Sequence, residues 1–395
     1  MLMYLFAVSG GCIMNVTNSI REGAIKVLYM CEWTGRGIHP AFLQYAYGLH
    51  KAGACVYLAT SGREYDPGTI QEAKDYGLNI VELPEFFDRS NNFKNAKQSL
   101  ASWLSVNSVD VIHCQGFREL YDVTRACRIN RQKHHIVMTD RNSGGWTGFG
   151  TMKRIALILW EKPWIIALSQ SHYDMLRRIP WIADRTAFIP NGVNTNIFRY
   201  VARPCSSNNH IIRLIYPAYF TSWKGHSAFL DFCQELAIAG RRFELLLPGY
   251  GPLEESVRSK VKSLGLTDYV KQLGRVPWKE LPELYARCDI GVFPTLSEMM
   301  PKAVLEMMST GLPVVAHDAG AIRDIIDHGK TGYITAVGDK KLFRSYLEHL
   351  MDNPHIRRAI GDAASEKMRT HFSIEVIGKQ TLALYNSICR ESQRI

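Results

Sequence analysis

The chain has 395 residues, 46% of them hydrophobic and 21% charged, with a formal net charge of +10 at pH 7. This composition is globular and excludes a disordered or fibrous protein, and the length predicts two domains rather than one core. The nine cysteines stand singly without a CxxC pair, which argues against a zinc knuckle or a disulfide framework and for a reducing compartment. The positive charge calls for an anionic partner: nucleic acid, an anionic membrane or a phosphorylated small molecule.

The first residues, MLMYLFAVSGGCIM, are apolar, lack a basic segment and are too short to span a bilayer. We interpret residues 1–23 as an N-terminal extension or as residues before a start at Met14, with a signal peptide as the alternative. No other stretch reaches the roughly 18 apolar residues that a transmembrane helix needs. The expected location is therefore the cytoplasm.

Residues 24–202 are predicted to form a first domain in which strands alternate with helices. The run Ala24–Met30 reads as a buried parallel strand, and after a glycine-containing loop a helical pattern ends at Gly53. Further strand-like runs are CVYLAT, VDVIHCQG, HHIVMTDR and WIIALSQS. Such alternation is typical of βαβ units with a parallel sheet. The polar segment 203–209 is the expected linker.

Residues 210–372 repeat the alternation and are predicted to form a second domain. Its strand-like runs are IIRLIYPAYF, FELLLPGYG, DIGVFPTLS, PVVAHDAG and GKTGYITAV. Residues 373–395 read as a C-terminal helix. The predicted fold class is α/β, with two Rossmann-like doubly wound domains whose ligand loops face a central cleft.

The segment SEMMPKAVLEMMSTGLPVVA, Ser297–Ala316, places two carboxylates, Glu298 and Glu306, in an otherwise apolar stretch. Pro301 suits the first turn of a helix that ends before Gly311. The helix start would present the backbone N–H groups of Met300, Lys302 and Ala303. Such a terminus binds phosphate, while the two carboxylates could accept hydrogen bonds from a sugar and a ribose. The alternative is a surface charge and a glutamate on a half-buried helix.

This segment resembles the donor-site signature of retaining glycosyltransferases with the GT-B fold. Other segments resemble the same family in order along the chain: TGRGIHPAFLQYAYGLHKAGACVYLAT, IPNGVNTNIF, SWKGHSAFL, LPGYGPLEE and GAIRDIIDHGKTGYI. The resemblance covers about residues 24–390. It implies a nucleotide-sugar donor (a UDP-sugar first, GDP-mannose second), a lipid-linked or polysaccharide acceptor, and a C-terminal helix that crosses back onto the first domain.

The resemblance also implies roles at the donor. Glu298 would contact the sugar, Glu306 the ribose and Lys224 the diphosphate. Tyr219 stands where the family usually has an arginine, so stabilisation of the leaving group falls more heavily on Lys224. Arg275 and Arg323 are candidate replacement cations. The remaining donor-binding candidates are Arg36, Gly37, Gly249 and Val276. Arg36, in the N-terminal loop, either approaches a diphosphate or a phosphorylated acceptor or is a solvated loop residue.

On the acceptor side, His113 matches a family position and is a catalytic candidate, with a purely structural role as the alternative. Arg141 stands where many relatives carry a histidine. Trp146 belongs to a glycine-rich stretch that forms either a mobile loop over the acceptor or a turn with one packed tryptophan. The segment MKRIALILWEKPWIIAL sets basic residues beside Trp160 and Trp164, which suits a membrane surface or a core helix with a solvated basic end.

The resemblance implies a front-face substitution, because no motif places a nucleophilic carboxylate as retaining hydrolases do. The sequence shows no Asp-x-Asp pair at a strand end and no His/Cys cluster with metal spacing, so neither a metal nor another cofactor is expected. No recognised motif supports nucleic-acid binding. Tyr219 and Arg141 suggest a rival function, an inactive nucleotide-sugar binder on the same fold, and a weaker rival is a phosphorylase.

Overall fold

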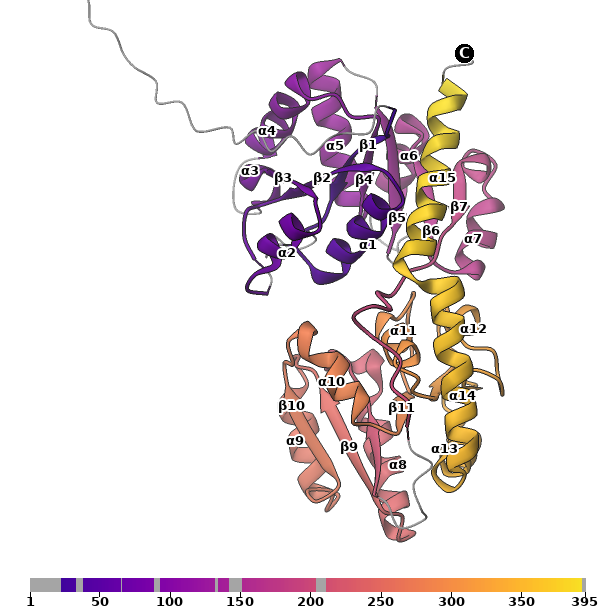
Figure 1. Cartoon of the computed structure of the whole chain (residues 1–395). Helices are drawn as coiled ribbons and strands as arrows, with labels where there is room; N and C mark the ends of the chain where they lie inside the picture. Colours follow the sequence, from indigo (N-terminus) through magenta and orange to yellow (C-terminus); the bar gives the residue numbers. More distant parts are fainter. Residues whose placement is uncertain are drawn as a thin grey trace, which may run out of the picture.

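The structure is a computed structural model. It describes residues 23–32, 38–64, 66–88, 93–131, 134–141, 151–203 and 211–392, with the side chains of 93–96, 151–154 and 392 excepted. The chain folds into two α/β domains, one above the other in Figure 1, and the last helix, α15 (Ile374–Ser392), lies beside the first domain. Most of the predicted N-terminal extension and linker therefore lies outside the described residues.

The first domain contains a seven-stranded sheet in the order β3-β2-β1-β4-β5-β6-β7, in which every pair is parallel. Its strands are β1 (Lys26–Met30), β2 (Cys55–Thr60), β3 (Asn79–Glu82), β4 (Val111–Cys114), β5 (His135–Asp140), β6 (Trp164–Ala167) and β7 (Thr186–Phe188). Its helices are α1 (Pro40–Lys51), α2 (Thr69–Asp75), α3 (Pro84–Phe87), α4 (Phe93–Val106), α5 (Phe117–Asn130), α6 (Thr151–Glu161), α7 (Gln170–Arg177) and the 3₁₀ turn η1 (Ala183–Arg185). The central strand β4 is buried at every position, as expected for a parallel sheet covered on both faces.

The second domain contains a six-stranded sheet in the order β10-β9-β8-β11-β12-β13, again parallel throughout. Its strands are β8 (Ile212–Ile215), β9 (Phe243–Pro248), β10 (Val270–Gly274), β11 (Ile290–Phe293), β12 (Val314–His317) and β13 (Tyr333–Thr335). Its helices are η2 (Ser222–Lys224), α8 (His226–Ile238), α9 (Glu254–Ser263), η3 (Trp278–Glu280), α10 (Leu281–Ala286), α11 (Lys302–Ser309), α12 (Ile322–Ile325), α13 (Lys340–Asp352) and α14 (Pro354–Lys367). Both sheets reverse their strand order near the centre, between β1 and β4 and between β8 and β11, where doubly wound folds bind ligands.

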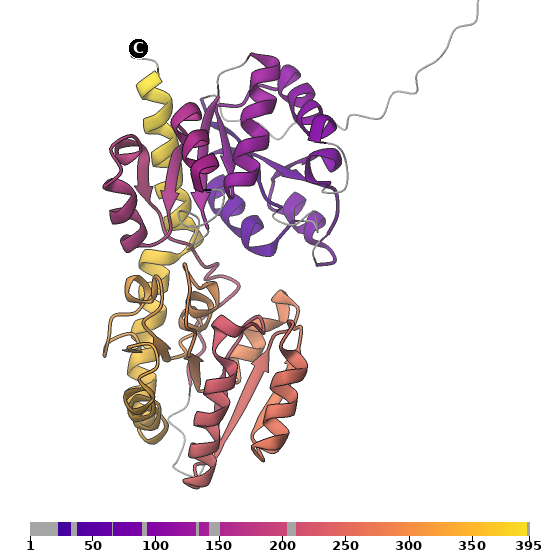
Figure 2. The ribbon, with the colours of Figure 1, turned by 180° about the vertical axis from the view of Figure 1, so that it is seen from behind.

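The C-terminal segment returns to the first domain, as the resemblance implies. A π-helical turn, η4 (Met368–Phe372), leads into α15 (Ile374–Ser392), which packs along α1. Figure 2 shows α15 beside the first domain from behind. Two glycines permit this contact, because a Cβ on Gly48 would lie 2.3 Å from the Ile374 carbonyl oxygen and one on Gly378 would lie 2.2 Å from the Gly48 carbonyl oxygen. The helix pair thus approaches backbone to backbone.

Several predicted elements differ in length from the observed ones. The predicted strand IIRLIYPAYF is only Ile212–Ile215, because Pro217 offers no N–H to continue a ladder. The edge strands β3 and β10, and the short β7, carry too little apolar pattern to have been predicted. The domain boundaries at 24–202, 210–372 and 373–395 stay predictions. In the structure the last strand of the first sheet ends at Phe188, and the second sheet begins at Ile212.

Candidate active site

A cavity of about 350 Å³ lies between the two domains. The first domain contributes His39, Pro40 and Asp66, and the second contributes the aromatic residues and the polar groups around Glu306. Its lining from the second domain is Pro217, Ala218, Tyr219, Pro248, Gly249, Tyr250, Arg275, Val276, Trp278, Leu281, Tyr285, Ala303 and Glu306. Five of the predicted donor-binding residues therefore share one cavity: Tyr219, Gly249, Val276, Ala303 and Glu306. This is the place that the sheet topology assigns to a ligand.

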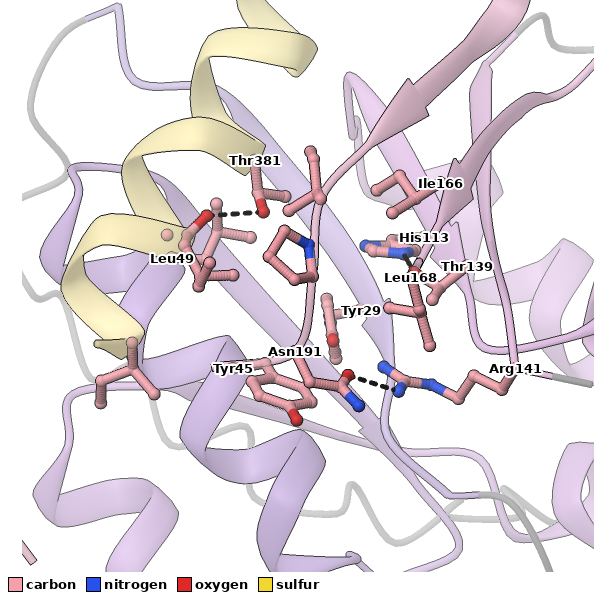
Figure 3. A pocket seen from close by; sticks show the side chains of 15 residues that line it. Tyr29, Tyr45, Leu49, His113, Thr139, Arg141, Ile166, Leu168, Asn191 and Thr381 are labelled. Atoms are coloured by element: carbon pink, nitrogen blue, oxygen red, sulfur yellow. Dashed lines mark hydrogen bonds between the residues drawn. The ribbon is translucent and has the colours of Figure 1, made fainter. Parts of the chain in front are cut away.

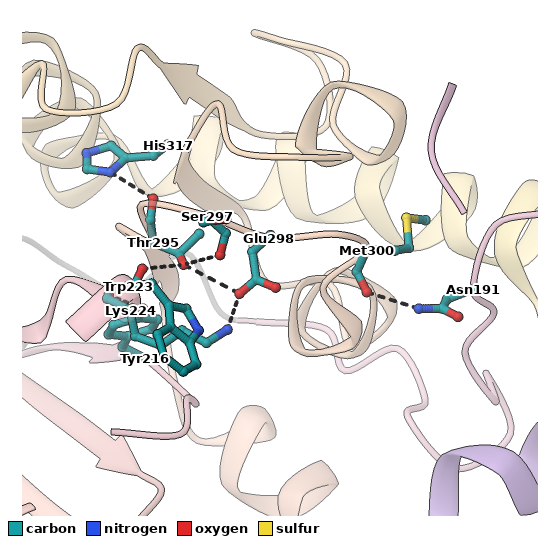
Figure 4. Close-up of polar contacts among 9 residues, drawn as sticks. All are labelled: Asn191, Tyr216, Trp223, Lys224, Thr295, Ser297, Glu298, Met300 and His317. Atoms are coloured by element: carbon teal, nitrogen blue, oxygen red, sulfur yellow. Dashed lines mark hydrogen bonds and ion pairs between the residues drawn. The ribbon is translucent and has the colours of Figure 1, made fainter. Parts of the chain in front are cut away.

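Lys224 and Glu298, which are separated by 74 residues in the sequence, meet at the carboxyl ends of the strands of the second domain. The Lys224 ammonium donates a hydrogen bond to the Glu298 carboxylate, and only 16% and 13% of the two side chains are exposed. Thr295 Oγ1 also lies 3.4 Å from Glu298 Oε1 (Figure 4). Lys224 Nζ lies 5.4 Å from the centre of the Phe293 ring. The predicted diphosphate cation and the predicted sugar-binding carboxylate are thus ion-paired with each other.

The start of α11 faces the first domain. Pro301 is the N-cap with an extended backbone (φ −73°, ψ 111°), and the helix begins at Lys302, as predicted. The Met300 carbonyl oxygen accepts a hydrogen bond of 3.0 Å from Asn191 Nδ2 in the segment that follows β7 (Figure 4). Met300 therefore lies at the contact between the domains.

Glu306 is buried on α11 and surrounded by donors. Trp278 Nε1 lies 3.2 Å from Oε1 and Tyr285 Oη lies 3.4 Å from Oε2. Lys302 Nζ, one helical turn earlier, lies 3.8 Å from Oε1. Burial raises the pKa of Glu306, whereas the Lys302 ammonium opposes that shift. The same burial lowers the pKa of Lys302, and Glu306 opposes that shift. The pair is therefore held together by mutual charge in a poorly solvated place.

Tyr219 carries no positive charge, but Arg275 lies near it as a candidate replacement cation. Tyr219 is 47% exposed, and its ring meets the Tyr250 ring edge-on, with 5.1 Å between centres. The Arg275 guanidinium lies 6.0 Å from the Tyr250 ring centre and pairs with Asp66 of the first domain at 2.6 Å. Arg323 pairs instead with Asp318 at 2.5 Å, is largely exposed and does not line the cavity. Of the two replacement cations, Arg275 is the one at the cavity.

Gly249 is a position where the chain tolerates no side chain. Its φ is 154°, and a Cβ there would lie 1.9 Å from the Ala218 carbonyl oxygen. The turn after β9 can therefore pack directly against the segment after β8. This close approach shapes the floor of the cavity beside Tyr219.

His113, at the end of β4, has both ring nitrogens engaged. Nδ1 lies 2.6 Å from the Tyr385 hydroxyl of α15, and Nε2 lies 2.7 Å from Thr139 Oγ1 of β5. The residue is 3% exposed, and burial, assisted by the Arg141 charge, lowers its pKa to about 3, so the ring is neutral at pH 7. It lines a small cavity of about 30 Å³ (Figure 3). His113 thus ties α15 to the first sheet, and its catalytic role stays a prediction.

Arg141 follows β5 and faces the same small cavity. Its Nε donates to Gln115 Oε1 at 2.9 Å, and its Nη1 donates to Asn191 Oδ1 at 3.0 Å (Figure 3). Because the same Asn191 amide donates to the Met300 carbonyl, one side chain connects Arg141 of the first domain with the loop before α11. Trp146, Arg36 and Gly37 lie outside the described residues.

The residues that sequence reasoning missed include Trp278, Tyr285, Asp66 and Asn191. Asn191 belongs to the segment IPNGVNTNIF, so a signal for it existed. The other three lie in segments without a motif, and their proximity to Glu306 and Arg275 arises only on folding.

The comparisons with known proteins agree with this architecture. Two Rossmann-like domains that face a cleft, with a C-terminal helix crossing back, define the GT-B class of glycosyltransferases, and solved GT-B structures superpose on nearly the whole chain. Residues 207–367 match the family model described as Glycosyl transferases group 1, and residues 36–197 match the model described as Glycosyltransferase Family 4. The chain belongs to the group 1 glycosyltransferases with the GT-B fold.

Similar curated proteins include three bacterial enzymes. The Amylovoran biosynthesis glycosyltransferase AmsK of Erwinia amylovora is 29% identical over 43% of each chain. The N-acetyl-alpha-D-glucosaminyl L-malate synthase of Bacillus anthracis is 30% identical over 38% of this chain and 39% of its own. The MMP alpha-(1->4)-mannosyltransferase of Mycolicibacterium hassiacum is 28% identical over 61% of this chain and 57% of its own. The chain spans about half the length of the curated relatives it matches.

Two solved structures show the likeness in fold. A glycosyltransferase from Rickettsia africae superposes with a TM-score of 0.76 at 17% identity, covering 93% of this chain and 99% of its own. Anabaena Alr3699/HepE in complex with UDP and glucose gives a TM-score of 0.74 at 18% identity, covering 92% and 100%. At such identities the likeness establishes the fold alone.

Proposed function

We propose that the protein is a retaining glycosyltransferase that moves a sugar from a nucleotide-sugar donor to a saccharide or lipid-linked acceptor. The observation that carries this proposal is the Lys224–Glu298 ion pair on the loop that leads into α11, together with an interdomain cavity that contains Glu306 of the same helix. A UDP-sugar is the first choice of donor, because Alr3699/HepE was solved with UDP and glucose, and GDP-mannose is the second. The names of relatives in amylovoran and colanic acid biosynthesis favour a polysaccharide acceptor.

The proposed mechanism uses positioning and charge. The leaving diphosphate gains negative charge in the transition state, and an ammonium and free helix N–H groups stabilise charge of that kind. Lys224 would move from Glu298 to the diphosphate, which frees Glu298 to accept hydrogen bonds from the sugar hydroxyls. The leaving oxygen would take the acceptor proton while the acceptor attacks the same face, so the anomeric configuration is retained. No protein nucleophile is needed for this route.

A donor panel tests the function. We expect UDP-glucose, UDP-galactose, UDP-N-acetylglucosamine or GDP-mannose to release its nucleoside diphosphate in the presence of saccharide acceptors, and the productive donor to raise Tm. A Tm increase without release by any donor would favour the inactive binder. Sugar 1-phosphate formation from an oligosaccharide and phosphate would favour the phosphorylase.

We propose that turnover is independent of metal ions, since Lys224 and the start of α11 supply the positive charge that a divalent cation would bring. Turnover should therefore persist in EDTA at close to its untreated rate. Loss of activity in EDTA, with recovery on adding Mg²⁺ or Mn²⁺, would contradict this proposal. A parallel assay of a metal-dependent transferase would confirm that the chelator is effective.

We propose further that the outer face of α5 and α6 contacts an anionic membrane. Trp160 is 76% exposed, and the Arg128 guanidinium lies 5.6 Å from its ring. Arg125 stacks similarly on Tyr121 at 4.3 Å. Trp164 does not share this face fully, since it packs partly against the first domain's core. Among the described residues, no helix has the length and apolar composition to cross a bilayer.

Sedimentation with vesicles checks the membrane proposal. The wild-type protein should sediment with phosphatidylglycerol-containing vesicles and much less with pure phosphatidylcholine vesicles, because charge and interfacial tryptophan act together. Trp160→Ala should reduce sedimentation several-fold, whereas Trp223→Ala, which removes an exposed tryptophan of the second domain, should not. Equal sedimentation of wild type and Trp160→Ala would contradict the assignment of this face.

A further inference from the structure

The acceptor side of the cleft contains a cation whose charge no described carboxylate neutralises. Arg141 donates to the amide oxygens of Gln115 and Asn191, both of which are neutral. Its guanidinium packs 4.9 Å from the ring centre of Phe42 and 5.5 Å from that of Tyr45, so aromatic faces rather than water cover much of it. A partly buried guanidinium held by neutral partners is available for an anion.

A second cation approaches from the other domain. Lys302 Nζ lies 6.0 Å from the centre of the same Tyr45 ring, so a cation of each domain approaches Tyr45. Lys302 shares its charge with Glu306 at 3.8 Å, and the carboxylate has two further donors. Burial, and after it the charges of Lys302, Arg141 and Arg275, lower the pKa of the neighbouring His39 to about 3.

Two buried donors beside Arg141 have no hydrogen-bond partner in the described part of the chain. These are Tyr45 Oη and Gln115 Nε2, on side chains that are 9% and 1% exposed. Buried polar groups are almost always satisfied, so such a pair points to a ligand. Gln115 Nε2 is an obligate donor, and Arg141 and Lys302 can only donate. A ligand that satisfies this set must be rich in acceptors.

The fold explains why these residues gather. Gln115 follows β4 and Arg141 follows β5, and these strands are parallel neighbours whose carboxyl ends open toward the cleft. Tyr45 lies on α1, and Lys302 opens α11 in the second domain. Figure 3 shows Arg141 reaching toward Asn191, with Tyr45 on the far side of that contact. The set therefore lies where the acceptor and the transferred sugar would meet.

We propose that Arg141, Lys302, Tyr45 and Gln115 together bind an anionic group of the substrate, a carboxylate or phosphate carried by the acceptor or by the transferred sugar. This inference rests on the proposed function, because it places the anion beside the sugar that is transferred. It makes the substrate acidic and gives Arg141 a role in specificity. The donor diphosphate is a different anion, assigned above to Lys224.

Calorimetric titrations with paired probes test the proposal and separate the two sources of the anion. The acceptor arm compares methyl β-D-glucuronide and glucose 6-phosphate with neutral methyl β-D-glucoside, with and without saturating UDP. The sugar arm compares UDP-glucuronate with UDP-glucose. In at least one arm, the wild-type protein should bind the anionic probe with a Kd lower by roughly tenfold or more than that of the neutral probe. A hydrogen bond to a charged group contributes free energy of that size. That arm identifies the source.

Arg141→Gln should abolish this preference and leave the affinity for UDP unchanged. Arg287→Gln is the matched control, since Arg287 is an exposed arginine that pairs with Glu283 on α10. Arg141→Lys should keep part of the preference. Tyr45→Phe should weaken anionic probes about 2- to 10-fold and leave neutral probes unchanged, which retains a test should Arg141→Gln fold poorly.

Three outcomes would overturn the proposal. One is the absence of any anionic preference in wild type, including no measurable binding of the anionic probes. Another is a preference that persists in folded Arg141→Gln. The third is a loss of UDP affinity in folded Arg141→Gln, which would assign Arg141 to the diphosphate. The proposed function fails differently, when no donor releases its nucleoside diphosphate. An anionic preference measured without UDP would still support the anion site.

Discussion

Lys224→Ala is expected to lower donor turnover by about 100-fold or more, the usual size of losing one electrostatic stabiliser of a transition state. In the structure Lys224 is paired with Glu298 and is largely buried, so its ammonium is held at the loop that leads into α11. Its removal also leaves the Glu298 carboxylate without its cation. Steady-state release of the nucleoside diphosphate measures the effect, and binding of the donor should fall much less than turnover.

A matched lysine and a rescue variant sharpen this experiment. Lys260→Ala removes another ion-paired lysine of the same domain, bonded to Asp231 at 2.8 Å, and should leave turnover unchanged. Tyr219→Arg should restore part of the activity of Lys224→Ala, because Tyr219 lines the donor cavity and an arginine there can reach a phosphate. Near-normal turnover of Lys224→Ala would transfer the role to Arg275. A folded double mutant without rescue would show that position 219 does not face the same phosphate.

Glu306→Ala is expected to weaken nucleotide binding by roughly 1.5–3 kcal/mol, about 10- to 150-fold in Kd, since a charged hydrogen-bond acceptor is lost. Glu306 lines the interdomain cavity, whereas Glu298 is bound to Lys224. Glu298→Ala should therefore affect UDP and GDP binding less and turnover more. Calorimetry with both nucleotides measures the difference. Wild-type affinity of Glu306→Ala for both would contradict the ribose assignment.

The environment of Glu306 requires a control for stability. The alanine variant leaves Trp278 Nε1, Tyr285 Oη and the partly buried Lys302 ammonium without their acceptor, which is destabilising by itself. Glu306→Gln keeps the shape and an acceptor oxygen but removes the charge. We expect both variants to have a lower Tm and a lower affinity for nucleotide than wild type. Both decreases should be smaller for Glu306→Gln than for Glu306→Ala. A normal Tm together with weak binding would point to a direct contact with the nucleotide.

The sequence by itself determined the fold class and the motif of the site, because both are local. Alternating buried runs and helical patterns predict parallel sheets without any knowledge of which strands are neighbours. The segment Ser297–Ala316 contains Glu298, the start of α11 and Glu306 within one helix and its loop, so its chemistry is readable residue by residue. Short edge strands such as β3 and β10 were not predicted, since they bury few side chains.

Only the tertiary structure decided which distant residues meet. Three contacts join segments that are far apart in the chain. Lys224 pairs with Glu298, Arg275 at the cavity pairs with Asp66, and His113 is hydrogen-bonded to Tyr385. Such contacts depend on loop conformation and on the close packing of the α15 backbone against the α1 backbone. No local sequence pattern encodes either. The partners of Arg141 follow the same principle, because β4, β5 and α1 must first assemble before their polar ends can converge.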